Sequence, residues 1–185
     1  MDDVYLPPDS QKRLIQLSRT ALEDFVRGDR IEASRVDDPY LHTPQFGAFI
    51  SLRKGEELRG CIGTCFPTRP LHETVVEMTE AAASRDDRVP PIYVGELRQI
   101  HIDISVLSPL YLVDDPFTLE VGKHGLHVTR DEKCGVLLPQ VATQYGWDLK
   151  TFLEQTCLKA GLPKAAWRWP ETRVSSFSAL IIEEG

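Results

Sequence analysis

The sequence predicts an α+β fold with a mainly antiparallel sheet flanked by helices. Helical and extended segments are mixed without a regular βαβ alternation, and short turns join consecutive extended segments into hairpins. One further segment alternates isoleucines with polar residues, as a half-buried strand does. The chain has 185 residues, 42% apolar and 26% charged, which is typical of a globular protein with its own core. We therefore expect one domain over residues 1–185, with any lobe boundary in residues 85–99 or after Pro109.

The first half of the chain is expected to form two helices and a hairpin. Asp9 or Ser10 can cap the first helix, and Gly28 can end it. Thr68, with Pro70 just inside the helix, is expected to start the second helix. The predicted elements are a helix over 9–27, strands over 46–53 and 58–66, and a helix over 71–84. The apolar face of the first helix is expected to contain Leu14, Leu17, Ala21, Leu22 and Phe25.

The second half begins with the clearest strand pattern of the sequence, over residues 100–106. A hairpin is expected around Asp131 and Glu132. Pro139 is expected at the first position of a short helix before Gly146, and Asp148 is expected to cap a longer helix. The predicted elements after the first strand are strands over 126–130 and 133–137, a helix over 149–160 and a strand over 175–183.

Composition limits the class of protein. Twenty-one Lys and Arg against 28 Asp and Glu give a net charge of −7, which disfavours binding to a phosphate backbone. The apolar runs are far shorter than the roughly 20 residues that a membrane-spanning helix needs. The N-terminal residues carry no signal-peptide pattern, so we expect a cytoplasmic protein with free thiols at its four cysteines. Cys61 and Cys65 alone are too few for a structural zinc site, and we expect no metal.

Several ordered motifs identify the chain with a known family. The segment Leu58–Thr64, with the sequence LRGCIGT, resembles the signature of the AMMECR-domain family, also called AmmeMemoRadiSam system protein A. The block DRVPP at 87–91, followed by Glu96 and Leu97, resembles a second family motif, with Val89 where the family usually has Phe. Further matching segments lie at 104–108, 122–126, 138–142, 146–148, 152–153 and 157–162, and at Phe177 and Glu183.

The resemblance implies a fold and a set of associates. The family fold is an α+β lobe with an antiparallel sheet, plus a smaller lobe, with a cleft beside the signature segment. The system name implies two partner proteins, one that resembles extradiol dioxygenases (a Memo-like protein) and one radical-SAM enzyme. The leading hypothesis is therefore an accessory component that acts with these two proteins through the signature segment.

Cys61 is the candidate nucleophile, because a thiol between Gly60 and Gly63 lies where another group can approach closely. The alternative is a small buried side chain in a strand that contains glycines. His124, in a turn before a strand, is the candidate general base for Cys61. Its alternative is a turn histidine whose ring bonds a backbone group.

Arg59 and Arg88 are the candidates for holding a small anionic ligand, because a guanidinium offers paired donors to a carboxylate or phosphate. The alternative for each is an ion pair with Asp86, Asp87 or Glu96. Together with Cys61, His124, Gly60 and Gly63, they define the second hypothesis, a cysteine-dependent enzyme acting on a small anionic substrate.

Common cofactor and catalytic motifs are absent from the sequence. It contains no Walker A, GxGxxG, HExxH or GxSxG motif and no radical-SAM CxxxCxxC motif, and we expect no cofactor. A third hypothesis, nucleic-acid binding, ranks last because of the acidic charge.

Overall fold

The computed structural model describes residues 3–29 and 35–185, and these form two compact units. The large unit comprises Val4–Leu107 and Leu180–Gly185, and the small unit comprises Ser108–Ala179 together with Asp3. The chain passes from the large unit to the small unit after Leu107, next to the boundary proposed after Pro109, and residues 85–99 lie within the large unit. The expected domain 1–185 includes residues 1–2 and 30–34, which lie outside the described residues.

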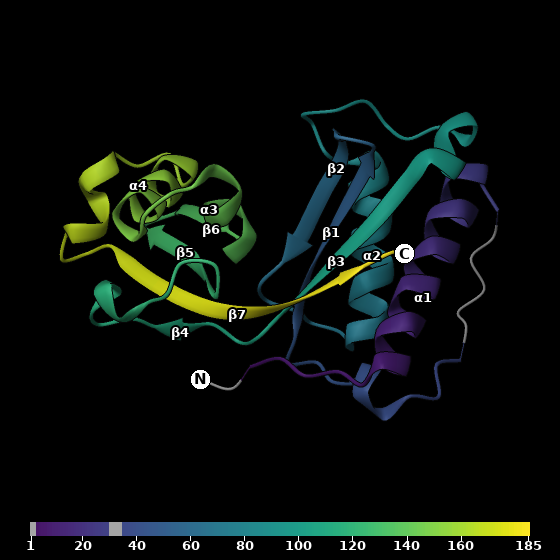
Figure 1. Ribbon diagram of the computed structural model, residues 1–185, viewed down its shortest axis with the longest axis horizontal. Coiled ribbons are helices and arrows are strands. Elements are labelled where there is room, and N and C mark those ends of the chain that lie inside the picture. Colours follow the sequence, from purple (N-terminus) through teal and green to yellow (C-terminus); the bar gives the residue numbers. More distant parts are fainter. Residues whose placement is uncertain (1–2, 30–34) are drawn as a thin grey trace. The chain divides into compact units, whose positions relative to one another are not determined.

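In the large unit, two helices cover one face of a sheet (Figure 1). The sheet pairs β1 with β2 and with β3, both antiparallel, and the end of β7 continues it beside β3. The core lies between this sheet and the helices, with Ile50, Leu52 and Ile102 fully buried. The elements are α1 (Pro8–Arg27), β1 (Gly47–Lys54), β2 (Glu57–Thr64), α2 (Leu71–Ser84), the 3-10 helix η2 (Val94–Gln99) and β3 (Ile100–Leu107).

The starts of both long helices differ from the prediction. Helix α1 begins after Pro7 without a side-chain cap, so Asp9 and Ser10 lie inside its first turn, where the Ser10 hydroxyl donates to the Asp38 carboxylate at 2.9 Å. Helix α2 likewise begins after Pro70 without a side-chain cap, so the capping roles proposed for Asp9, Ser10 and Thr68 are wrong. Prolines supply the fixed φ that starts each helix.

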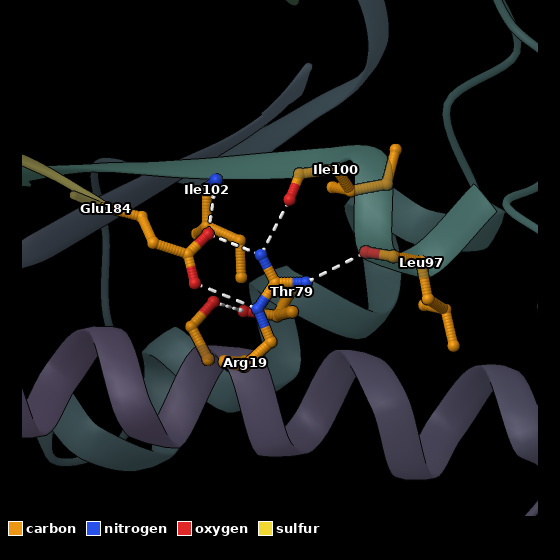
Figure 2. A network of polar contacts seen from close by, with 7 residues as sticks. Arg19, Thr79, Leu97, Ile100, Ile102 and Glu184 are labelled. Atoms are coloured by element: carbon orange, nitrogen blue, oxygen red, sulfur yellow. Dashed lines mark hydrogen bonds and ion pairs between the residues drawn. The ribbon is translucent and has the colours of Figure 1, made fainter. Parts of the chain in front are cut away.

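A polar network fixes α1 to β3 and to the end of the chain (Figure 2). Arg19 donates to the carbonyls of Leu97 at 3.2 Å and Ile100 at 2.6 Å, and it forms an ion pair with Glu184. The Glu184 carboxylate also accepts the backbone N–H of Ile102 at 3.1 Å. One guanidinium therefore bridges α1, η2, β3 and the segment after β7.

The small unit has its own sheet and core (Figure 1). Strand β5 pairs with β6 and β7, and the short β4 pairs with β7, all antiparallel. Its core includes Leu126, Val128, Phe152 and Leu153. The elements are β4 (Tyr111–Leu112), β5 (His124–Arg130), β6 (Lys133–Leu137), α3 (Pro139–Tyr145), α4 (Leu149–Lys159) and β7 (Arg173–Glu183), whose last residues belong to the large unit.

The predicted fold class is confirmed, and each predicted helix and strand is present within a few residues of its expected bounds. Asp148 caps α4 as expected, accepting the Thr151 N–H at 2.7 Å. Phe25, predicted on the apolar face of α1, is 37% exposed, whereas Leu14 and Leu22 of that face are fully buried. Within residues 3–29 and 35–185, no helix has the length and apolarity to cross a membrane.

Candidate functional site

The signature segment forms β2, the edge strand of the large unit's sheet. The space beside Gly60 and Gly63, where a side chain would lie, is occupied by other parts of the chain. A Cβ at Gly60 would overlap the carbonyl oxygen of Ala82 on α2. A Cβ at Gly63 would overlap the Ala48 carbonyl and the Phe49 ring on β1. The two glycines therefore allow close packing of β2 against its neighbours.

Cys61 is half-buried and makes polar contacts through its backbone and its side chain. Its backbone N–H donates to the Asp86 carboxylate at 2.8 Å, and its carbonyl accepts from Arg88 Nη2 at 3.1 Å. The Ser51 hydroxyl on β1 lies 3.2 Å from Sγ. Two side chains thus bond the Cys61 backbone at the outer edge of β2, where a further strand would otherwise pair.

Asp86 and Arg88 form a paired, two-point contact in the loop after α2. Arg88 Nε lies 2.8 Å from Asp86 Oδ1, and Nη2 lies 2.6 Å from Oδ2. These hydrogen bonds, with those from the Cys61 and Arg88 backbone N–H groups, hold the pKa of Asp86 well below its usual range. The Asp86 side chain is buried, whereas 56% of the Arg88 side chain is exposed.

Arg59 is committed to a buried ion pair. Its Nε and Nη2 donate to the two carboxylate oxygens of Glu96 at 3.1 and 2.7 Å, and its Nη1 donates to the Pro90 carbonyl at 3.2 Å. The pair lowers the pKa of Glu96 and raises the pKa of Arg59. Both candidate anion-binding arginines therefore have the ion-pair partners proposed as their alternatives.

A row of polar residues crosses the sheet at Cys61. On β1, Ser51 lies opposite Cys61 of β2 and opposite Asp103 of β3. Burial and the nearby Glu183 raise the pKa of Asp103, although Arg53 at 3.8 Å opposes the shift. The sequence alternation places Asp103 on the face of its strand opposite the isoleucines. It gives no information on which strands are neighbours, so sequence reasoning did not identify Asp103 and Ser51 as site residues.

His124 lies at the start of β5, in the small unit, whereas Cys61 belongs to the large unit. Its Nδ1 accepts the backbone N–H of Glu120 at 2.9 Å. Burial, with a contribution from Lys123, lowers the pKa of His124, which favours a neutral ring. The ring thus bonds a backbone group, as the alternative proposed, and its pairing with Cys61 stays a prediction.

None of the four cysteines, all of which lie in the described residues, forms a disulfide bond. Across the part of the chain that the structure describes, no three His, Cys, Asp or Glu side chains form a group that could hold a metal ion.

Comparison with known proteins relates the chain to archaeal proteins. The AMMECR1 family model matches residues 15–182. A protein of Methanothermobacter thermautotrophicus is 40% identical over 185 residues, covering 97% of this chain and 96% of the relative. Protein TK0174 of Thermococcus kodakarensis is 39% identical over 181 residues, covering 92% and 88%.

A solved structure has the same fold. The crystal structure of the uncharacterized protein PH0010 from Pyrococcus horikoshii matches with a TM-score of 0.91 at 35% identity, covering 97% of this chain and 93% of that chain. With the family model matching most of the chain and these relatives matching nearly all of it, the chain belongs to the AMMECR1 family.

Proposed function

We propose that this chain is a non-catalytic accessory protein of the cytoplasm that docks on partner proteins through a surface beside its signature segment. The partners are a Memo-like protein and a radical-SAM enzyme, as the family resemblance implies. The docking surface, named here the 88–94 patch, consists of Arg88, Pro90, Pro91, Tyr93 and Val94.

One observation carries the proposal: large apolar side chains are exposed on a firmly anchored loop. Tyr93 is 60% exposed and Val94 is 56% exposed, and Pro90 and Pro91 beside them are exposed as well. Exposed aromatic and apolar side chains of this kind are enriched where proteins bind one another.

The loop is held at several points, so the patch has a defined shape before a partner arrives. The Ile92 N–H bonds the Ala83 carbonyl of α2 at 2.9 Å, and the Pro90 carbonyl accepts from Arg59. The Tyr93 N–H donates to Glu96 at 3.3 Å, and the Glu96 N–H donates back to the Tyr93 carbonyl at 3.1 Å. A preorganised surface loses little conformational entropy on binding.

The polar groups of the signature segment support this role over catalysis. Arg59 and Arg88 are both neutralised by carboxylates, and Cys61 uses both backbone groups to bond Asp86 and Arg88. These contacts fix the position of the loop that carries the patch.

Affinity purification of the tagged chain from its native cell tests the proposal. We expect the Memo-like and radical-SAM proteins of that cell to co-purify with the wild-type chain and to be lost with the double variant Tyr93→Ser, Val94→Ser. The matched control is Tyr40→Ser, because Tyr40 is also an exposed tyrosine of the large unit. Recovery of neither partner with the wild-type chain contradicts the proposal.

A second candidate is a cysteine-dependent enzyme, favoured by the polar row on the sheet. Ser51 lies within hydrogen-bond distance of the Cys61 thiol, and the carboxyl group of Asp103, with its raised pKa, occupies the next strand. In this alternative Cys61 is the nucleophile and Arg88 binds a small anionic substrate. Turnover of such a substrate that disappears in Cys61→Ala and persists in Tyr93→Ser, Val94→Ser would favour the enzyme over the accessory role.

A further inference from the structure

A second cysteine, outside the signature segment, lies beside a histidine. Cys134 on β6 and His127 on β5 place Sγ 3.1 Å from Nε2. The hairpin register explains the contact: Cys134 pairs with Thr129, so it is the diagonal neighbour of His127 on one face of the sheet. The predicted hairpin turn at Asp131 and Glu132 sets the register that brings Cys134 and His127 together, although sequence reasoning identified neither Cys134 nor His127 as a candidate.

The surroundings of the two residues differ. Cys134 is exposed, because β6 is the edge strand of the small unit's sheet, whereas His127 is only 5% exposed. The neighbouring Gly135 faces α4, so the Cys134 side chain points away from that helix. The thiol can therefore meet a molecule from solvent while its imidazole neighbour stays fixed in the sheet.

At rest the proton lies on the sulfur and the ring is neutral, so the ring can act as a general base during attack, although both pKa shifts disfavour a thiolate–imidazolium pair before attack. Burial lowers the pKa of His127, so the ring is neutral near pH 7. Although Cys134 as a whole is exposed, partial burial raises the pKa of its thiol, so the sulfur keeps its proton at rest. With the ring proton on Nδ1, Nε2 accepts the hydrogen of the thiol.

We propose that Cys134 and His127 form a thiol–imidazole pair that reacts with low-molecular-weight disulfides to give a mixed disulfide at Cys134. As Sγ attacks one sulfur of the reagent, His127 Nε2 takes the thiol proton, a new S–S bond forms and the reagent's S–S bond breaks. The leaving thiolate then takes the proton from Nε2 and departs as a thiol. The Cys134 sulfur is oxidised and the leaving sulfur is reduced, so the exchange needs no other oxidant.

The rate of mixed-disulfide formation with oxidised glutathione, resolved for each cysteine by peptide mass spectrometry, tests the proposal. A positioned base accelerates proton transfer, so His127→Gln should slow modification of Cys134 by about tenfold or more. The rate at Cys61 in the same molecules should not change, which makes Cys61 the internal control. An unchanged rate at Cys134 in a folded His127→Gln chain overturns the proposal.

A second comparison keeps the test decisive if His127→Gln does not fold. The buried Cys157 reports folding, because it becomes modified in an unfolded chain. In that case the wild-type chain is compared with and without urea. Cys134 should react faster in the folded chain, where His127 lies beside it, than in the unfolded chain. A rate that is equal or slower in the folded chain overturns the proposal.

Discussion

Arg59 and Glu96 neutralise each other inside the large unit, where their side chains are only 6% and 2% exposed. Buried charges are tolerated when both partners are present and their hydrogen bonds are satisfied. Here the carboxylate accepts two bonds from Arg59 and one from the Tyr93 N–H. The pair therefore positions the loop next to β2, and its energetic importance appears when one partner is removed.

Arg59→Met is expected to lower the free energy of unfolding by about 3–5 kcal/mol, because it leaves the Glu96 carboxylate buried and unpaired. Urea denaturation followed by circular dichroism measures the change. The double variant Arg59→Met, Glu96→Leu should recover most of the loss, since no buried charge is left. The exposed Arg98 is the control, and Arg98→Met should change stability by less than about 0.5 kcal/mol. Equal effects of Arg59→Met and Arg98→Met would contradict this account.

The lowered pKa of Asp86 predicts that the stability of the folded chain depends on pH. Its pKa in the folded chain lies below the unfolded value of about 4, so its stabilising contribution is complete above that value and is lost as the pH falls toward the folded pKa. Asp86→Asn should therefore destabilise the chain more at about pH 6 than at about pH 3, measured by urea denaturation. Asp87→Asn, at an exposed neighbouring position, should show no such difference. The same Asp86→Asn loss at both pH values would refute the assignment.

At the scale of elements, the packing of β2 on α2 depends on a missing side chain. Gly60 lies against the Ala82 carbonyl, which belongs to helical backbone and has little freedom to move. The edge of the same strand is bonded by Asp86 and Arg88. The signature segment is thus fixed from its helix-facing side and from its edge.

Gly60→Ala is expected to cost about 1–3 kcal/mol of stability or more, because the new methyl group forces β2 and α2 apart. Gly95→Ala is the control, since its Cβ would meet only the ring of the exposed Tyr93, which can rotate away. Thermal unfolding of both variants provides the comparison. A Gly60→Ala chain as stable as Gly95→Ala would show that the close approach is unimportant.

The Arg19 network joins four segments of the large unit (Figure 2). Arg19→Met should lower the free energy of unfolding by about 1–3 kcal/mol, because the Leu97 and Ile100 carbonyls lose a donor and Glu184 loses its ion pair. Hydrogen exchange of the Ile102 amide, which bonds Glu184, should accelerate in this variant. Arg27→Met, on the same helix, removes only an exposed contact with Glu23 at 3.4 Å and should have little effect. An Ile102 amide whose exchange does not change would contradict the bridging role.

The local sequence pattern predicted the positions of the helices and strands better than it predicted the residues that cap the helices. The turn at Asp131 and Glu132 fixes the register of its hairpin, and the isoleucine alternation identifies β3, because both signals depend on adjacent residues. Helix starts were less predictable, since Ser10 bonds Asp38, a residue 28 positions away. The residues adjacent to a side chain in the sequence do not indicate which distant residue it will bond in the fold.

The same limit applied to the candidate site. The sequence located Cys61, Arg59 and Arg88, but the pairing of β1 with both β2 and β3 places Ser51 and Asp103 in the same row. Strand order results from packing among distant segments, and hairpin signals alone leave it open.

At the scale of the whole molecule, one chain builds two compact units and β7 contributes to both. The signature segment, the buried ion pair and the 88–94 patch all belong to the large unit, whereas Cys134 and His127 belong to the small unit. The accessory role and the thiol chemistry can therefore be separated by variants in different units.

Isothermal titration calorimetry tests the accessory role most directly. The purified chain is titrated with the Memo-like protein of the same cell. We expect saturable binding that Cys61→Ala leaves unchanged and that Tyr93→Ser, Val94→Ser weakens by about tenfold or more, because central apolar side chains contribute most of the binding energy of an interface. Binding that survives the patch variant, or the absence of any binding by the wild-type chain, would contradict the account.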